Sequence, residues 1–386
     1  FGVFPLRGRV INAIKEKKAK VMANKEVSDI FKIMGLNPGL DYSEDESIKT
    51  LRYGHIAFMT DADHDGNHIK GLLIALCQAY FPGLLKRKEF LLSFITPIVK
   101  ITKGTGKKAK VTSFYNQDKF EKWLKKNQQG RGWKIKYYKG LGTSTSAEGR
   151  DYFRDWDRHV LPFLVKDPKK CEEAVKLAFN KNADGRKKWL TEDPPEDTKE
   201  TNSNGSQSIV NFIHNEVREY SLHTMATKLP NLYDGMKPTQ RKILYTMLNG
   251  PNKEVKVVQL GGQVMKDTGY HHGDKSLTDT IVSMAQSFVG KNNINFLMPN
   301  GQFGTRLEGG SDAASPRYIH TMLNQPLVSL LFPKDDMKLL RYEEMDGMVV
   351  EPSFFVPILP LCLVNGVIGI ATGFSSTIPN HNPEDV

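Results

Sequence analysis

Residues His55–Phe81 read HIAFMTDADHDGNHIKGLLIALCQAYF, and they decide the fold class that we expect. The apolar run at 56–59 has the length of a short buried strand. Beyond Asn67 the apolar residues recur at helical spacing, so a helix follows the intervening loop. A strand that leads through a loop into a helix predicts an α/β domain. Open α/β sheets bind ligands beyond the carboxyl ends of their strands, so we expect a site in this loop.

Three aspartates, Asp61, Asp63 and Asp65, alternate along that loop. Adjacent carboxylates repel one another unless a cation lies among them, and hard oxygen ligands suit Mg²⁺. The first half of an EF-hand loop has the same pattern, but its twelfth position is Leu72 here instead of Glu, and a strand leads in. We interpret the loop as a candidate metal site, with a solvated acidic turn as the alternative.

A second stretch, GGSDAASPRYIHTML at 309–323, places Arg317 directly before Tyr318. Tyrosine is a weak nucleophile at neutral pH because a phenol ionises near pKa ~10. A neighbouring cation can hold a phosphate and stabilise the charge that builds on its oxygens. The pair therefore suits phosphoryl transfer to a tyrosine oxygen. For an isolated Arg-Tyr pair, an ordinary surface position is the more common explanation.

The composition points to an anionic partner. The 386 residues carry a formal net charge of +11, and the pI is about 9.3. This length allows two or three domains. Three scattered cysteines (Cys77, Cys171, Cys362) predict no disulfide framework and a reducing compartment. The chain starts at Phe1 without a signal or transit peptide, so we expect an internal piece of a longer protein.

Residues 352–372 contain no charged side chain and have about the length of a membrane span. Three prolines and two glycines interrupt this stretch, and such residues break helices. We therefore expect buried strands and turns there.

The clearest linker is TEDPPEDTKETNSNGSQS at 191–208, which is acidic, rich in Pro, Ser and Asn, and without periodicity. Two basic motifs precede the linker. A predicted strand ends in a Gly-rich turn that carries Lys139, in the sequence YYKGLG. Arg186 and Lys187 are neighbours in the sequence GRKKWL. Glycines beside a lysine favour close approach of a phosphate. We expect a domain boundary at the linker.

After the linker, YDGMKPTQRK places Lys237 and Arg241 at the start of a helix that Pro238 opens. Cations at the start of a helix interact unfavourably with the helix dipole, so they add no stability to the helix. A phosphate backbone that lies across that end of the helix is a better explanation for their position. Further on, YHHGDKSL precedes another predicted helix, with Ser276 as its expected cap. Short helices with basic turns suit a winged-helix or helix-turn-helix module.

Eight motifs together give the chain a specific resemblance. In order they are PLRGR, TDADHDGNHIKGLL, YYKGLGTSTS, YDGMKPTQRK, YHHGDKSL, NGQFGTR, ASPRYIHTML and PILPLCLVNGVIGIATGF. They cover nearly the whole chain, which resembles the DNA-cleavage core of a eukaryotic-type DNA topoisomerase II. The resemblance implies a multidomain α/β plus α+β protein: a Rossmann-like TOPRIM domain at 1–160, a helical connector and linker at 161–205, a winged-helix domain at 206–350 and the start of a tower domain at 351–386.

The resemblance also implies roles. Tyr318 would attack a DNA phosphodiester and join the 5′ end, and Arg317 would stabilise the transition state. Asp61, Asp63 and Asp65 would hold Mg²⁺ for the tyrosine of the partner subunit in a homodimer. Residues that would line the cleaved phosphates or contact double-stranded DNA are Arg9, Asn12, Lys139, Arg186, Lys187, Lys237, Arg241, Tyr270, His272 and Ser276. Ile370 would wedge between base pairs and bend the duplex.

Departures from the family pattern predict a divergent member, viral or protist. Arg9 replaces a lysine, Ile368 a glutamate, Ala371 a glycine and Phe374 a tryptophan. The first TOPRIM glutamate and the ATP-binding domain would lie before Phe1, so ATP would act elsewhere in the protein. We expect a nuclear location for a cellular enzyme and a cytoplasmic replication site for a viral one. A TOPRIM nuclease or primase and a non-catalytic DNA-binding module remain the alternatives.

Overall fold

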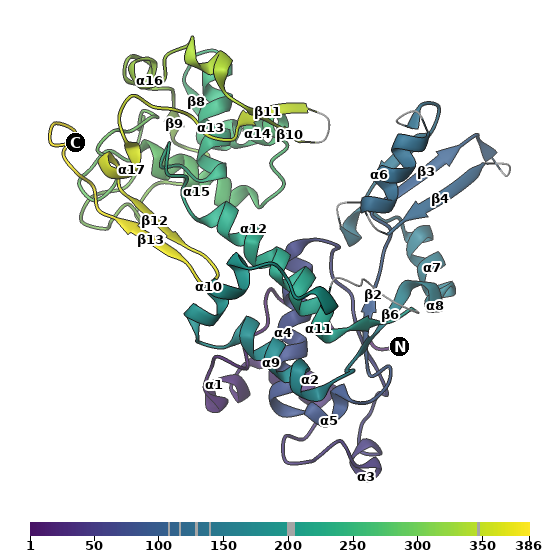
Figure 1. The fold of residues 1–386 in the computed structure, drawn as a ribbon. Coiled ribbons are helices and arrows are strands. Elements are labelled where there is room, and N and C mark those ends of the chain that lie inside the picture. The colour runs from purple at the N-terminus through teal and green to yellow at the C-terminus, as the bar shows by residue number, and fades with distance from the viewer. Residues whose placement is uncertain (107–108, 116, 128–129, 139, 199–204, 346–347) are drawn as a thin grey trace. The chain divides into compact units, whose positions relative to one another are not determined.

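The computed structural model describes residues 1–106, 109–115, 117–127, 130–138, 140–198, 205–345 and 348–386. These residues form two compact units, Phe1–His223 and Thr224–Val386 (Figure 1).

The division between the units falls inside helix α12 (Arg218–Lys228), later than the linker at which we expected it. The described part of that linker belongs to the first unit. Asn215 donates a hydrogen bond to the carbonyl of Thr198 at 2.9 Å, and strand β7 (Gln207–Ser208) pairs in parallel with β6 (Val160–Leu164). These contacts join the described ends of the linker, Thr198 and Gln207–Ser208, to the first compact unit.

The first unit holds a four-stranded sheet in the order β1-β2-β6-β7 and a three-stranded sheet in the order β4-β3-β5. Its remaining strands are β1 (Ile56–Phe58), β2 (Leu91–Phe94), β3 (Val99–Lys103), β4 (Lys110–Phe114) and β5 (Lys134–Tyr137). Its helices are α1 (Lys18–Met22), α2 (Lys25–Met34), α3 (Asp45–Ile48), α4 (His64–Tyr80), α5 (Pro82–Leu85), α6 (Gln117–Lys126), α7 (Ser146–Arg154), α8 (Trp156–His159), α9 (Pro168–Phe179), α10 (Ala183–Thr191) and α11 (Ile209–Phe212), which a π-helical turn at Ile213–Val217 joins to α12.

The expected strand–loop–helix unit is present. β1 pairs in parallel with β2, and α4 follows after five residues. The helix begins at His64, earlier than the apolar spacing indicated, because the Asp63 side chain caps it by accepting a hydrogen bond from the amide of Gly66 at 2.7 Å. Asp61 and Asp63 therefore precede the helix, and Asp65 lies in its first turn. The α/β expectation is confirmed.

Helix α4 is fixed firmly beneath this loop. Its residues from Leu72 to Cys77 are all buried, and it lies against α9. At Gly71 the ring of Phe179 comes so near that an added Cβ would lie 2.8 Å from its Cζ atom. Close packing on both sides holds the start of α4 in place.

The second unit is a helical cluster with three small sheets. Its helices are α13 (Pro238–Asn249), α14 (Val257–Thr268), α15 (Asp274–Ala285), α16 (Gln325–Leu331) and α17 (Leu361–Val364). Its strands pair as β8 (Val255–Lys256) with β9 (His320–Thr321), β10 (Tyr342–Met345) with β11 (Met348–Pro352), and β12 (Val367–Ile370) with β13 (Ser375–Ile378).

Helices α13, α14 and α15 bury one apolar core, and α13 and α14 also lie against β11 (Figure 1). Leu244, Leu260 and Leu277 from the three helices are fully buried. Pro238 is the first residue of α13, as expected. Ser276 is not a cap, because α15 already begins at Asp274 with Gly273 at its N-cap position.

The charge-free stretch at 352–372 contains α17 and β12, linked by turns. Among the described residues, no helix combines the length and apolarity needed to cross a bilayer. The three cysteines are buried and unpaired.

Candidate active site and nucleic-acid interface

Tyr318 lies in a turn whose backbone is tied to helix α14. The amide of Tyr318 donates to the carbonyl of Ser315 at 2.9 Å, which closes the turn. The first two amides of α14, Val257 and Val258, donate to the carbonyls of Ile319 at 3.1 Å and Pro316 at 3.2 Å. These amides have no hydrogen-bond acceptor within their own helix, so the carbonyls of the turn take that place. The same two hydrogen bonds hold the turn against the start of α14. The Tyr318 side chain is 70% exposed.

Arg317 extends beside the tyrosine ring. Its guanidinium carbon lies 5.5 Å from the centre of the Tyr318 ring, and its Nε donates to the Ser315 hydroxyl at 3.3 Å. A guanidinium has five donors, so most of them remain available to an anion that approaches the phenol. Tyr318 and Arg317 therefore face solvent together on one short turn.

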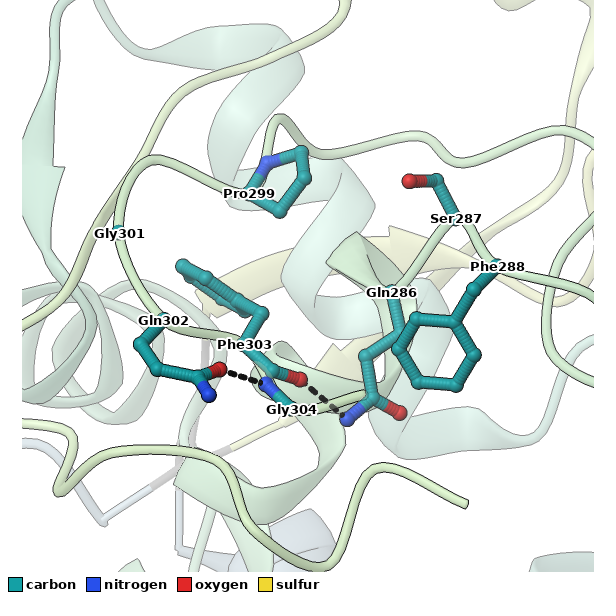
Figure 2. Close-up of a pocket in the computed structure, with 8 residues that line it drawn as sticks. All are labelled: Gln286, Ser287, Phe288, Pro299, Gly301, Gln302, Phe303 and Gly304. Carbon is teal, nitrogen blue, oxygen red and sulfur yellow. Dashed lines mark hydrogen bonds between the residues drawn. The ribbon is translucent and has the colours of Figure 1, made fainter. Parts of the chain in front are cut away.

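The segment at 299–304 supports the other side of this turn. Asn300 and His320 exchange backbone hydrogen bonds of 3.0 and 3.1 Å, and the carbonyl of Gln302 accepts from the amide of Ala314 at 2.9 Å. Figure 2 shows a pocket with residues 286–288 on one side and Pro299 with residues 301–304 on the other. The Gln286 amide crosses it and donates to the carbonyl of Phe303 at 2.8 Å. This bond fixes the loop that holds the tyrosine turn.

In the first unit, the three aspartates are exposed, and each has a protein partner. Asp61 accepts a hydrogen bond from the amide of Leu141 at 2.7 Å. Asp63 caps α4, and Asp65 pairs with Arg9 at 2.6 Å. The carboxylates lie where we expected them, beyond the carboxyl end of β1.

Arg9 is held between Asp65 and an aromatic stack. Its second guanidinium nitrogen donates to the Tyr220 hydroxyl at 2.8 Å, and the Tyr220 ring stacks on His68 with 4.0 Å between centres. Burial, and then the nearby Arg9 charge, lower the pKa of His68 to about 4, so this imidazole is neutral at physiological pH. No local sequence pattern indicated this arrangement, because Arg9 and Tyr220 are 211 residues apart.

Two protein-family models match the chain and together cover most of it. The model for the C-terminal associated domain of TOPRIM matches residues 94–225, and the model for the A subunit of DNA gyrase/topoisomerase IV matches residues 228–386. The whole chain is 46% identical to mouse DNA topoisomerase 2-alpha and 46% identical to DNA topoisomerase 2 of Arabidopsis thaliana. The chain belongs to the type II DNA topoisomerase family.

The chain spans about a quarter of the length of these topoisomerases, 26% of each. It also resembles a solved topoisomerase structure, the DNA-binding, cleavage and re-ligation domain of Plasmodium falciparum topoisomerase II. That match has a TM-score of 0.82 and 43% sequence identity, and it covers 99% of this chain and 51% of the other.

Membership in this topoisomerase family implies a divalent metal, and the aspartate loop has suitable ligands. Its exposed carboxylates are the hard oxygen donors that such ions prefer. Within the described ranges, no three His, Cys, Asp or Glu side chains are grouped closely enough to hold an ion among themselves. A site built from one or two carboxylates plus water and substrate phosphate fits this loop, and it is a usual arrangement for Mg²⁺.

Several side chains that topoisomerase resemblance assigns to DNA are accessible. His272 and Ser276 are exposed at the start of α15, and Ile370 is 75% exposed on β12. Lys187 on α10 is about half exposed, with Asp184 as a neighbour at 3.3 Å. Lys237 is partly buried, and both burial and the nearby Lys228 lower its pKa.

Arg241 does not lie where we expected it. It is 5% exposed and pairs inside the core with the fully buried Asp234, at 2.8 Å from Nε to Oδ2. It also donates to the carbonyl of Met236 at 3.1 Å. Its position at a helix start, which suggested a phosphate contact, reflects this internal ion pair instead.

Three other predicted DNA contacts have internal partners as well. Asn12 donates to the carbonyl of Phe179 at 2.8 Å and accepts from two amides of its own turn. Arg186 donates to the carbonyl of Asn180, and burial lowers its pKa. Tyr270 is 6% exposed, with its ring 5.5 Å from that of His272. Lys139 lies outside the described residues.

Proposed function

We propose that this chain cleaves and rejoins double-stranded DNA through a phosphotyrosine intermediate, as the DNA-cleaving core of a type II topoisomerase. One observation supports this most strongly: Tyr318 is 70% exposed on a turn tied to α14, with the Arg317 guanidinium beside its ring. A fixed nucleophile next to a cation is the arrangement that attack on a phosphate needs.

In the proposed reaction the Tyr318 oxygen gives up its proton and attacks a backbone phosphorus. The bond from phosphorus to the 3′ oxygen breaks, the phosphotyrosyl bond forms at the 5′ end, and the 3′ oxygen takes up a proton. Reversal of the same steps rejoins the strand. Arg317 stabilises the added charge on the phosphate oxygens, and His272, exposed at the start of α15, lies against the cleaved phosphate.

The acidic loop of Asp61, Asp63 and Asp65 would hold Mg²⁺ through one or two of its carboxylates together with water and the DNA phosphate, and the ion would lower the charge on that phosphate. We propose a homodimer in which the acidic loop of one subunit serves the tyrosine of the other. ATP-driven strand passage by the whole protein, in the nucleus of a cell or at a viral replication site in the cytoplasm, belongs to the same proposal.

The test is to trap the intermediate. The protein is incubated with supercoiled DNA and Mg²⁺, denatured and analysed for covalently bound DNA. We expect an adduct from the unaltered protein and none from Tyr318→Phe, which should still bind DNA. Tyr233→Phe is the matched control, because Tyr233 is 62% exposed in the same unit. Cleavage without an adduct would indicate a TOPRIM nuclease, and binding without cleavage a non-catalytic module.

A further inference from the structure

The β12–β13 hairpin presents two isoleucines to solvent. Residues along β12 alternate between its faces. Val367 is buried, and Gly369 packs so closely on the backbone at 228–230 that an added Cβ would lie 2.7 Å from the carbonyl oxygen of Lys228. Ile368 and Ile370 point the other way and are 66% and 75% exposed. Both large apolar side chains therefore share the outer face.

The facing strand places hydroxyls beside these isoleucines. Thr377 pairs with Ile368, and Ser375 pairs with Ile370, in an antiparallel register. Both are exposed, and neither hydroxyl has a hydrogen-bond partner within the described ranges. The outer face of the hairpin thus combines an apolar ridge with two hydroxyl groups that can donate hydrogen bonds. Such a face suits a binding partner whose surface is apolar at its centre and polar at its rim.

The charges around the hairpin favour DNA as the partner. Residues 352–383 contain no acidic side chain, so the hairpin does not repel phosphates. Its inner face rests on the backbone at 228–230, which places the exposed Lys228 next to the hairpin. Lys237 lies near Lys228, since burial and then the Lys228 charge lower the pKa of Lys237. Positive charge therefore lies beside the apolar ridge. Binding of this face to an apolar protein surface or to a second copy of this basic chain does not require positive charges nearby, whereas binding to a phosphate backbone does.

We propose that Ile368 is a second DNA-contacting residue beside Ile370, to which the resemblance assigns the bending of the duplex, and that it determines a base preference near the bent step. This proposal rests on the proposed function. Two residues along a strand span about 6.7 Å, close to the ~6.8 Å of two base-pair steps. When Ile370 enters one step from the minor groove, Ile368 lies over the groove floor about two base pairs away.

The chemistry of that groove floor gives the preference. A G·C pair presents an amino group in the minor groove, and an A·T pair presents only acceptors. An aliphatic side chain over the amino group removes water from it without replacing the hydrogen bond. Ile368 therefore favours A·T about two base pairs from the bent step.

The experiment compares Ile368→Ala with the unaltered protein by sequencing the ends of trapped covalent complexes. We expect the A·T preference at that position to disappear, and cleavage-competent binding to weaken by about 5- to 30-fold through the lost apolar contact. The melting temperature should not change, because the side chain is exposed. Ile368→Leu should keep the preference, and Leu339→Ala, an 85% exposed leucine elsewhere in the unit, should leave both properties unchanged.

The same base preference in Ile368→Ala and the unaltered protein would overturn the proposal, while equal adduct formation in both would leave the proposed function intact. A changed oligomeric state without DNA, measured by sedimentation, would also overturn it, because the outer face would then bind another copy of the chain. If the unaltered protein formed no Tyr318 adduct, the proposed function itself would fail.

Discussion

The acidic loop at residues 61–65 and the tyrosine turn at residues 315–318 hold their functional groups in opposite ways. In the loop each carboxylate is engaged by the protein: by the Leu141 amide, by the helix that Asp63 caps, or by Arg9. In the turn the backbone is engaged instead, and the Tyr318 hydroxyl has no hydrogen-bond partner among the described residues.

The two sites therefore position their functional groups by different means. Backbone bonds to α14 fix the turn that carries Tyr318, the proposed nucleophile, and they do not engage its hydroxyl. The carboxylates instead have partners that a bound cation would have to replace in part. Arg9 and Asp65 are each about half exposed, so exchanging their contact costs little.

The largest expected effect concerns the core that carries the tyrosine turn. Asp234→Ala should lower the free energy of unfolding by about 3–5 kcal/mol, because it leaves the buried Arg241 charge without its partner. Chemical denaturation of both proteins measures this change in the free energy of unfolding. Lys275→Ala is the control, because its ion pair with Asp279 is exposed and its loss should cost less than about 1 kcal/mol. Equal effects would show that the Arg241 pair is not part of the core.

The next prediction tests the tyrosine turn itself. Arg317→Ala should reduce kcat by about 10²–10³, the usual loss when one donor to the transition state is removed. Its melting temperature should stay constant, because Arg317 contacts only Ser315 and the neighbouring ring among the described residues. Steady-state relaxation of supercoiled DNA by the full-length protein with ATP measures the rate. A rate within a factor of two of the unaltered protein would remove Arg317 from the mechanism.

A third prediction concerns the support of the acidic loop. The pKa of His68 lies at about 4 in the folded protein, below its ordinary value of 6.5. The unfolded chain therefore binds more protons between these values, and stability falls as the pH drops from about 6.5 to 4, by roughly 3 kcal/mol in total. His68→Phe keeps an aromatic ring and should flatten this decline. An acid decline of the same steepness in both proteins would exclude His68 as its cause.

The smallest effect separates the two cations at the start of α13. Lys237→Met should make the slope of log K against log salt shallower by about 0.9, as expected for one lost phosphate contact. Position in the sequence alone predicts the same of Arg241, but its burial predicts no change in slope from Arg241→Met in whatever protein remains folded. Fluorescence binding titrations at several salt concentrations measure both slopes. A changed slope for Arg241→Met and none for Lys237→Met would reverse the assignment.

The sequence predicted local features well. The apolar run before Asp61 and the helical spacing after it placed Asp61 and Asp63 correctly between strand and helix, because both periods arise from neighbouring residues. Asp65 was expected in the loop but lies in the first turn of α4. It could not tell that Arg241 faces Asp234 inside the core, since a basic cluster at a helix start looks the same whether it points inward or outward.

Long-range contacts explain the other differences. Arg9 is held by Tyr220, which lies 211 residues away in the sequence, and no local pattern connects them. The charge-free run around Ile370 predicted buried strands and turns, and for β12 this prediction is wrong on its outer face, where Ile368 and Ile370 are exposed. The structure exposes Ile370, because it is the neighbouring Gly369 that packs on the segment at 228–230.

The most direct measurement identifies the amino acid that carries the DNA. Trapped covalent complexes are digested with nuclease and protease, and the nucleotide-bearing peptide is sequenced by mass spectrometry. We predict a single modified residue, Tyr318, joined to a 5′ phosphate. Attachment at another tyrosine, or at a 3′ phosphate, would contradict the assignment of Tyr318 as the nucleophile that opens the DNA backbone.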